Sequence, residues 1–67
     1  MENSWEEERA GFIASEIGGA VFELIIEGVV ISRDSIVDSL EAKRRVVGNT
    51  IHKGILREAA EHVRKGR

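Results

Sequence analysis

Cysteine and proline are both absent from this sequence of 67 residues, and aromatic residues are scarce. Without cysteine, the chain has no disulfide and no thiolate ligand for a metal ion. Proline breaks helices, so its absence removes the strongest obstacle to long helical segments. Together with a charged fraction of 33% and only Trp5, Phe12 and Phe22 as aromatic residues, this composition favours a helical fold.

A long hydrophobic run is also lacking. The longest apolar stretch, residues 17–26, contains Glu23. It is far shorter than the roughly 20 apolar residues of a membrane-spanning helix. The N-terminus is acidic, whereas a secretory signal starts with a positively charged region. We therefore expect a cytoplasmic protein that does not cross a membrane.

The length of the chain predicts a single helical domain over residues 1–67. A domain of this size buries only roughly 60% of the surface that its unfolded chain exposes. Such small domains usually gain stability from disulfides, a metal ion or oligomerisation. Cysteine is absent, and His52 and His62 are the only histidines. The apolar content of 42% therefore favours a homodimer.

Helix signals occur at both ends of the first third of the chain. Ser4 and Glu7 have the spacing of a capping box, in which each side chain accepts a hydrogen bond from the other residue's backbone. Gly28 suits the left-handed position that follows many helices. These signals predict a first helix over residues 4–27.

Two more helices are predicted in the rest of the chain. Ser32 is a suitable N-cap for a helix over residues 33–47. Gly48, followed by two residues that can cap a helix, predicts a break and a third helix over residues 50–64. An unbroken helix over residues 33–63 is the alternative, because apolar residues keep a near-helical register through Gly48. The predicted fold is therefore all-α, with two or three helices in an antiparallel helical hairpin that dimerises into a helical bundle.

The first predicted helix is apolar on more than one face. One apolar stripe consists of Ile13, Ile17, Ala20, Val21 and Leu24. A second stripe beside it consists of Phe12, Gly19, Phe22 and Ile26. A helix of this kind is either deeply buried or makes two sets of contacts, and so short a chain has little protein to cover both faces. We predict that the second stripe is the dimer interface.

Gly18 and Gly19 lie in the middle of the same predicted helix. Each glycine costs about 1 kcal/mol relative to alanine in a helix interior. With Ala20 they form a notch of small side chains in which another helix can approach closely. The alternative is a local kink or a weak helix. Flanking apolar side chains favour close packing.

Residues that carry out catalysis elsewhere do not form a recognisable site in this sequence. Gly18 and Gly19 lack the following lysine of a phosphate-binding loop. His52 and His62 lie on a polar helix, and Asp34 with Asp38 complements the dipole at a helix start. We predict that the protein is not an enzyme and that it has no catalytic residue, cofactor, metal ion or small-molecule substrate.

The two halves of the chain differ in charge. Residues 1–32 carry seven acids and one base, whereas residues 33–67 carry nine bases and five acids. Either the halves attract each other across the fold, or the basic half binds an anionic partner. Direct DNA contact would use Lys43, Arg44, Arg45, Lys53 and Arg57. The break at Gly48 before a basic helix loosely resembles a helix-turn-helix, but the acidic pI of about 5.6 argues against this function.

A family resemblance runs through residues 6–65. The run Ile17-Gly18-Gly19-Ala20-Val21, followed by Leu24, Gly28, Ile36 and Ser39-Leu40, resembles the YmgB/AriR family of small enterobacterial regulators. A weaker similarity to the fumarase D type of small helical protein lies around Val21 and Gly28.

The YmgB/AriR resemblance implies an all-α homodimer that acts as a connector in biofilm formation and acid resistance through a two-component phosphorelay. It implies no catalytic residue. The leading hypothesis is therefore a non-enzymatic regulatory adaptor that binds a signalling protein, and the runner-up is a small dimeric DNA-binding regulator.

Overall fold

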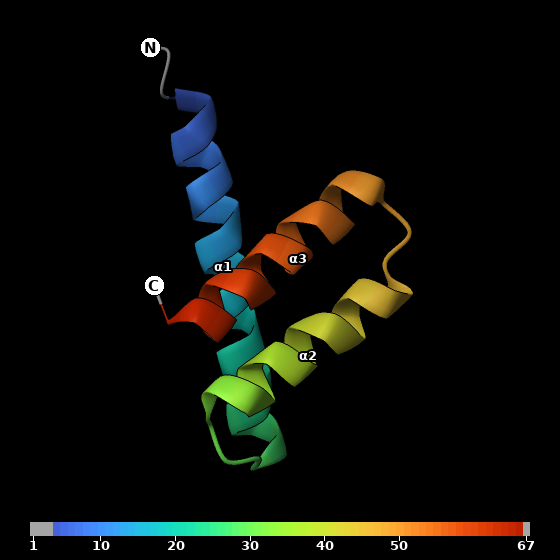
Figure 1. Ribbon diagram of the computed structural model, residues 1–67. Helices are drawn as coiled ribbons and strands as arrows, with labels where there is room; N and C mark the ends of the chain where they lie inside the picture. The colour runs from blue at the N-terminus through green and yellow to red at the C-terminus, as the bar shows by residue number, and fades with distance from the viewer. Residues whose placement is uncertain (1–3, 67) are drawn as a thin grey trace.

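The computed structural model describes residues 4–66, with side chains from Glu6 onward. It contains three helices, which are α1 (Ser4–Glu27), α2 (Arg33–Val46) and α3 (Thr50–Lys65), and no strand occurs among residues 4–66 (Figure 1). The predicted all-α class is confirmed, and the alternative of one unbroken helix over residues 33–63 is wrong. The Ser4 side chain of the predicted capping box lies outside the described side chains.

The helix ends have the predicted chemistry. Gly28 follows α1 with a φ of 71°, a left-handed conformation that favours glycine. Ser32 caps α2, because its hydroxyl accepts from the Ser35 amide at 3.1 Å while the Ser35 hydroxyl accepts from the Ser32 amide at 2.8 Å. Asn49 caps α3 by accepting from the His52 amide at 3.0 Å. The break around Gly48 is therefore stabilised by a cap on the helix that follows it.

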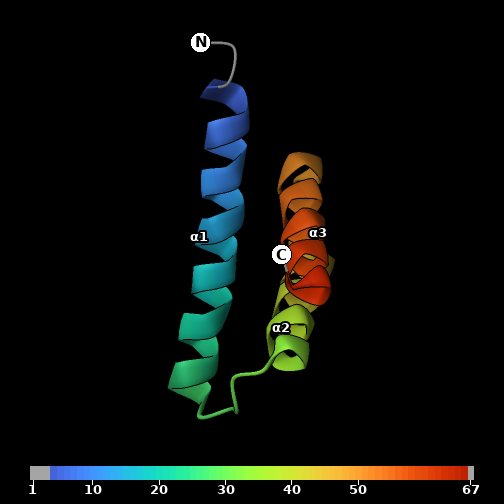
Figure 2. The same cartoon turned by 60° about the vertical axis from the view of Figure 1, so that its left-hand side comes forward.

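The helices form two layers. α2 and α3 lie side by side as an antiparallel hairpin, and α1 crosses behind both of them (Figure 1). Turning the molecule shows α1 as one layer and the hairpin as the other, so that one side of α1 faces no other helix of the chain (Figure 2).

The core lies between these two layers and is small. Leu40 and Leu56 are the largest fully buried side chains, and full burial of a leucine contributes about 1.5–3 kcal/mol. The first predicted stripe of α1 faces this core, with Ile13 and Ile17 packed against its edge. Among the residues whose side chains are described, the eight buried apolar ones are Ala20, Leu24, Val37, Leu40, Ile55, Leu56, Ala59 and Ala60. Because α1 contributes only two of them, the longest helix is held by little buried surface.

Ile51 departs from the apolar pattern of the sequence, whereas the glycine notch fits it. Ile51 continues the apolar stripe of α3 in sequence, yet 72% of it is exposed because it lies in the first turn, beyond the edge of the core. The notch at Gly18 and Gly19 is open, since a Cβ atom added to either residue would meet nothing within 4 Å. The helix continues unbroken through both glycines, so the notch is available to a molecule outside the chain.

Candidate interaction surfaces

The side of α1 that faces away from the hairpin exposes several large apolar side chains. Positions 11, 15, 18 and 22 each precede by two a core-facing position of α1, which places them on the opposite side of the helix. We call this side, together with its borders, the outer face of α1. Phe12 lies at the border with α3 and Gly19 at the border with α2. The outer face comprises Gly11, Phe12, Ser15, Gly18, Gly19, Phe22, Ile25 and Ile26. All eight residues are exposed.

The outer face leaves large apolar side chains in water. Phe12 and Phe22 are 58% and 63% exposed, and Ile25 and Ile26 are 58% and 68% exposed. Because an aromatic side chain has an area of roughly 150–250 Å², each phenylalanine leaves on the order of 100 Å² uncovered. An apolar patch of several hundred Å² is typical of an interaction site. The predicted interface residues Phe12, Gly19, Phe22 and Ile26 all belong to this face.

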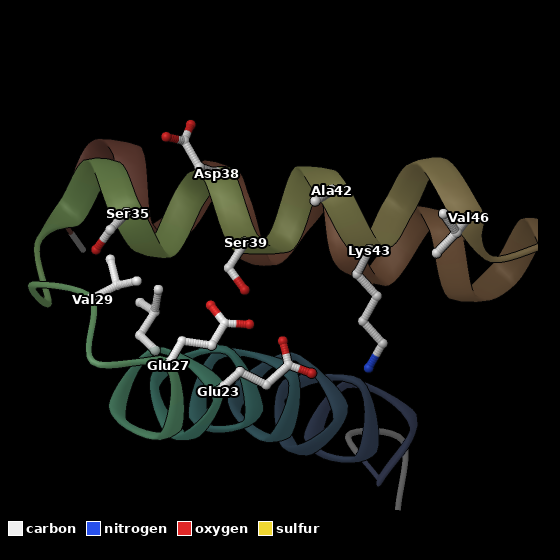
Figure 3. A pocket seen from close by; sticks show the side chains of 10 residues that line it. Glu23, Glu27, Val29, Ser35, Asp38, Ser39, Ala42, Lys43 and Val46 are labelled. Atoms are coloured by element: carbon white, nitrogen blue, oxygen red, sulfur yellow. The ribbon is translucent and has the colours of Figure 1, made fainter.

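A groove runs between the C-terminal half of α1 and the outer side of α2. Its volume is about 600 Å³, and Leu24, Val29 and Val46 supply apolar lining. Carboxylates of Glu23 and Glu27 lie along its α1 side, whereas Ser35, Ser39 and Lys43 line its α2 side (Figure 3). The groove thus combines an apolar lining with acidic groups.

Glu16 joins all three helices. Its carboxylate accepts from Lys43 Nζ on α2 at 2.9 Å and lies 2.8 Å from His52 Nε2 on α3. Partial burial raises the pKa of Glu16, but the hydrogen bonds with Lys43 and His52 together lower it further than burial raises it. The pKa of Glu16 therefore lies below its ordinary value, and the charged form is the one that stabilises the fold.

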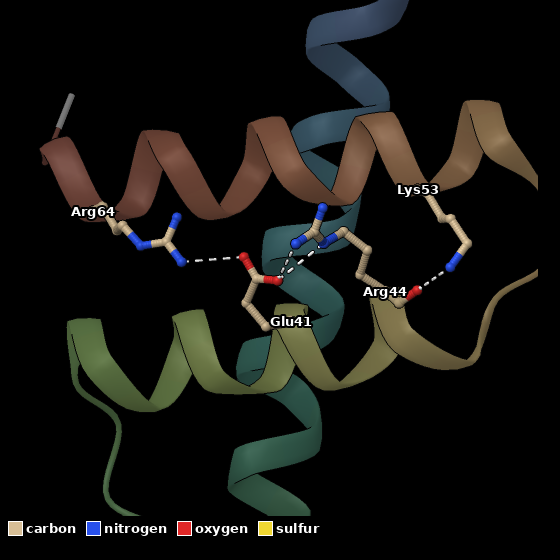
Figure 4. A network of polar contacts seen from close by, with 4 residues as sticks. All are labelled: Glu41, Arg44, Lys53 and Arg64. Atoms are coloured by element: carbon tan, nitrogen blue, oxygen red, sulfur yellow. Dashed lines mark hydrogen bonds and ion pairs between the residues drawn. The ribbon is translucent and has the colours of Figure 1, made fainter.

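Glu41 forms a second ionic network, between α2 and α3. It accepts from Arg44 Nε at 3.0 Å and from Arg64 Nη2 at 3.1 Å, and Lys53 Nζ donates to the Arg44 carbonyl at 2.9 Å (Figure 4). Partial burial raises the pKa of Glu41, but the two arginine hydrogen bonds lower it further. These contacts hold α2 and α3 together along the polar edge of the hairpin.

Some of the charged residues of the acidic and basic halves form ion pairs with each other. Glu16 of the acidic half pairs with Lys43 and His52 of the basic half. Arg9, the base in the acidic half, makes a two-pronged pair with Glu58 at 2.9 and 2.6 Å. The pairing of Glu16 with Lys43 supports the hypothesis that the halves attract each other, whereas the pair of Arg9 with Glu58 has the opposite polarity.

The basic residues predicted for DNA contact fall into two groups, those with contacts inside the protein and those that are exposed. Lys43, Arg44 and Lys53 take part in the contacts described above. Arg45 and Arg57 are exposed, and neither makes an ion pair within residues 4–66. The helices of a helix-turn-helix cross at roughly 90–120°, whereas α2 and α3 lie antiparallel (Figure 1). Direct DNA binding stays an untested hypothesis, and the hairpin gives it no support.

Comparison with known proteins supplies no identity. No family model, curated protein or solved structure matches this chain. Among the described residues, no group of three or more histidine, cysteine, aspartate or glutamate side chains is arranged to hold a metal ion. No helix in this part of the chain is long and apolar enough to cross a membrane.

Sequence reasoning missed part of these surfaces. Ile25 was not assigned to the interface, although its spacing of three from Phe22 places it on the same side of a helix. The three-helix contact of Glu16 and the groove beside Glu23 carry no local sequence signal. Both depend on residues far apart in the chain that meet only after the helices pack.

Proposed function

We propose that this protein is a small, non-enzymatic regulatory adaptor that self-associates through the outer face of α1 and binds a segment of a signalling protein. The observation that carries the proposal is the exposure of Phe12, Phe22, Ile25 and Ile26 on one side of a single helix. Burial of these side chains in a second molecule would remove the apolar surface that the small core leaves in water. Dimerisation would thus add buried apolar surface to the small core of the protomer.

The groove between α1 and α2 is the surface for the second partner. Its apolar lining and the carboxylates of Glu23 and Glu27 fit an amphipathic helix that carries lysine or arginine beside its apolar stripe. Opposite charges at such a surface speed association and select partners more than they add affinity. The groove lies on the side of α1 that contacts α2, so it would stay open while the outer face is occupied.

The cellular role rests on the sequence resemblance to the YmgB/AriR family. It supports a cytoplasmic connector in biofilm formation and acid resistance that feeds into a two-component phosphorelay. The geometry is compatible with this role, because an adaptor needs two separate binding surfaces and no catalytic centre.

Sedimentation velocity tests the self-association. Phe22→Glu should convert the dimer into a folded monomer, because Phe22 is 63% exposed and contributes little to the protomer's core. Val46→Glu is the matched control, since Val46 is 81% exposed but lies on α2, away from the outer face. A wild-type protein that stays monomeric at high micromolar concentration would refute the dimer.

Capture experiments test the second surface. The adaptor should retain a signalling protein, and Val46→Glu together with Ala42→Glu should abolish this retention without dissociating the dimer. Random duplex DNA at low salt serves as the competing test. Binding that weakens steeply as salt is added would support the DNA-binding hypothesis in place of the adaptor.

A further inference from the structure

The outer face of α1 is uneven along its length. Its N-terminal half presents mainly small residues, Gly11, Ser15 and Gly18, with Phe12 at the edge that borders α3. Its C-terminal half presents Phe22, Ile25 and Ile26, all of which are more than half exposed. The large side chains of the C-terminal half therefore fit against the small residues of the N-terminal half. Two copies can bring these unlike halves together only if their α1 helices pair in opposite directions.

We infer that two copies of this chain pair through antiparallel α1 helices that cross at Gly18 and Gly19. This inference rests on the proposed self-association and specifies its geometry. A two-fold axis between residues 18 and 19 places residues opposite each other when their numbers add to 37. Phe22 then lies over Ser15 of the second copy, and Ile26 lies over Gly11 of the second copy. Such an interface is self-complementary, as a two-fold dimer requires.

The space at these positions is present in the protomer. A Cβ atom added to Gly11, Gly18 or Gly19 would meet nothing within 4 Å, so the second helix can approach the backbone closely. In an antiparallel two-fold pair, each side edge of α1 lies next to the same edge of the second copy's α1. In this register Phe12 and the second copy's Ile26 are therefore on the same edge and nearly level along the helix axis. The large side chains of both copies are thereby covered.

Charge also favours the antiparallel direction. The first turns of α1 carry Glu6, Glu7 and Glu8. A parallel pair would bring both triplets together, with six carboxylates at one end of the interface, and like charges at such a distance repel. An antiparallel pair separates the two triplets by nearly the length of α1 and opposes the two helix dipoles.

The area of the interface limits its strength. The four large side chains of the outer face expose roughly 400 Å² per copy, about half of what one partner contributes to a standard interface. Interfaces of this size are weak and transient, so we expect a dissociation constant in the micromolar range. The exchange of subunits should accordingly be fast.

Single-cysteine variants test the register, because the chain has no cysteine of its own. The Cα atoms of a disulfide lie within about 7 Å of each other. In the antiparallel pair, the two copies of residue 18 are separated by only about 1.5 Å along the helix axis, whereas the two copies of residue 11 are separated by about 22 Å. Under mild oxidation, Gly18→Cys should therefore form a linked dimer at least ten times faster than Gly11→Cys.

A mixture of Gly11→Cys with Ile26→Cys should form the mixed dimer faster than either variant links to itself. Gly48→Cys, on an exposed loop, gives the collisional rate. Self-linking of Gly11→Cys as fast as that of Gly18→Cys would show a parallel pair and overturn the antiparallel register. If wild type sediments as a dimer but Gly18→Cys links no faster than Gly48→Cys, the register also fails while the proposed self-association stands. A monomeric wild type would defeat the proposed self-association itself.

Discussion

Replacement of Gly19 by alanine should have opposite effects on the protomer and on the dimer. Gly19 lies in the interior of α1, and an added Cβ atom would meet nothing within 4 Å of it in its own chain. Alanine is favoured over glycine in a helix interior by about 0.8–1.0 kcal/mol. The isolated protomer should therefore gain nearly this free energy of unfolding. In a domain of this size, that gain corresponds to a rise in Tm of about 4–8 °C.

The dimer should instead be weakened by the same methyl group. An extra methyl forced into a close contact typically costs about 1–3 kcal/mol, and the dimer carries two of them, so the dissociation constant should rise by at least about thirtyfold. Gly54→Ala is the matched control, because Gly54 also lies inside a helix with open space at its Cβ position, but on α3. It should raise the stability equally and leave dimerisation unchanged.

Thermal unfolding at a dilution where the protein is monomeric gives the first quantity, and sedimentation equilibrium gives the second. Equal stabilisation by both variants with an unaltered dimer affinity would show that the second helix does not approach Gly19. A loss of protomer stability in Gly19→Ala would contradict the open space that the structure places there.

Three further predictions concern the protomer alone. Leu56→Ala should lower the free energy of unfolding by about 2–5 kcal/mol, because Leu56 is fully buried. A domain of 67 residues has a total free energy of unfolding of only about 3–10 kcal/mol, so far-UV circular dichroism should show a largely unfolded chain. Cooperative, wild-type-like unfolding would contradict the assigned core. Although partial burial raises it, the pKa of Glu16 is held below its ordinary value by Lys43 and His52, so the folded state binds fewer protons than the unfolded state. The contribution of Glu16 to the free energy of unfolding is complete above the ordinary carboxyl pKa of about 4.3 and is lost as the pH falls through the lowered pKa. Glu16→Gln should therefore reduce the loss of stability at acid pH, measured by urea unfolding at a series of pH values. Glu23→Gln, at an exposed position, should leave that loss as in wild type. Gly28→Ala should destabilise the protomer by about 1–2 kcal/mol, because the φ of 71° strains alanine although space is open; chemical denaturation that shows no loss would argue against the left-handed turn.

The contacts that join the three helices could not be predicted from local patterns. The hydrogen bonds of Glu16 with Lys43 and His52 span 27 and 36 residues of sequence, and a salt bridge between distant surface residues leaves no periodic trace. The same is true of the groove, whose acidic side comes from α1 and whose other side comes from α2. Lys43, Arg44 and Lys53 look like a basic patch in sequence, and only the packed hairpin shows their partners.

Local physics was enough to determine the helices of this protein. Caps at Ser32 and Asn49, the left-handed glycine after α1 and the absence of proline act through neighbours in sequence, so the sequence alone determined where helices begin and end. The two apolar stripes of α1 were also readable, because helical periodicity is a local property. Tertiary structure alone decided which stripe is inside: α2 and α3 cover Ala20 and Leu24, since one hairpin is wide enough to cover only one side of a helix. Phe22 and Ile26 are therefore exposed to solvent in the protomer and available for contact with a second copy of the chain.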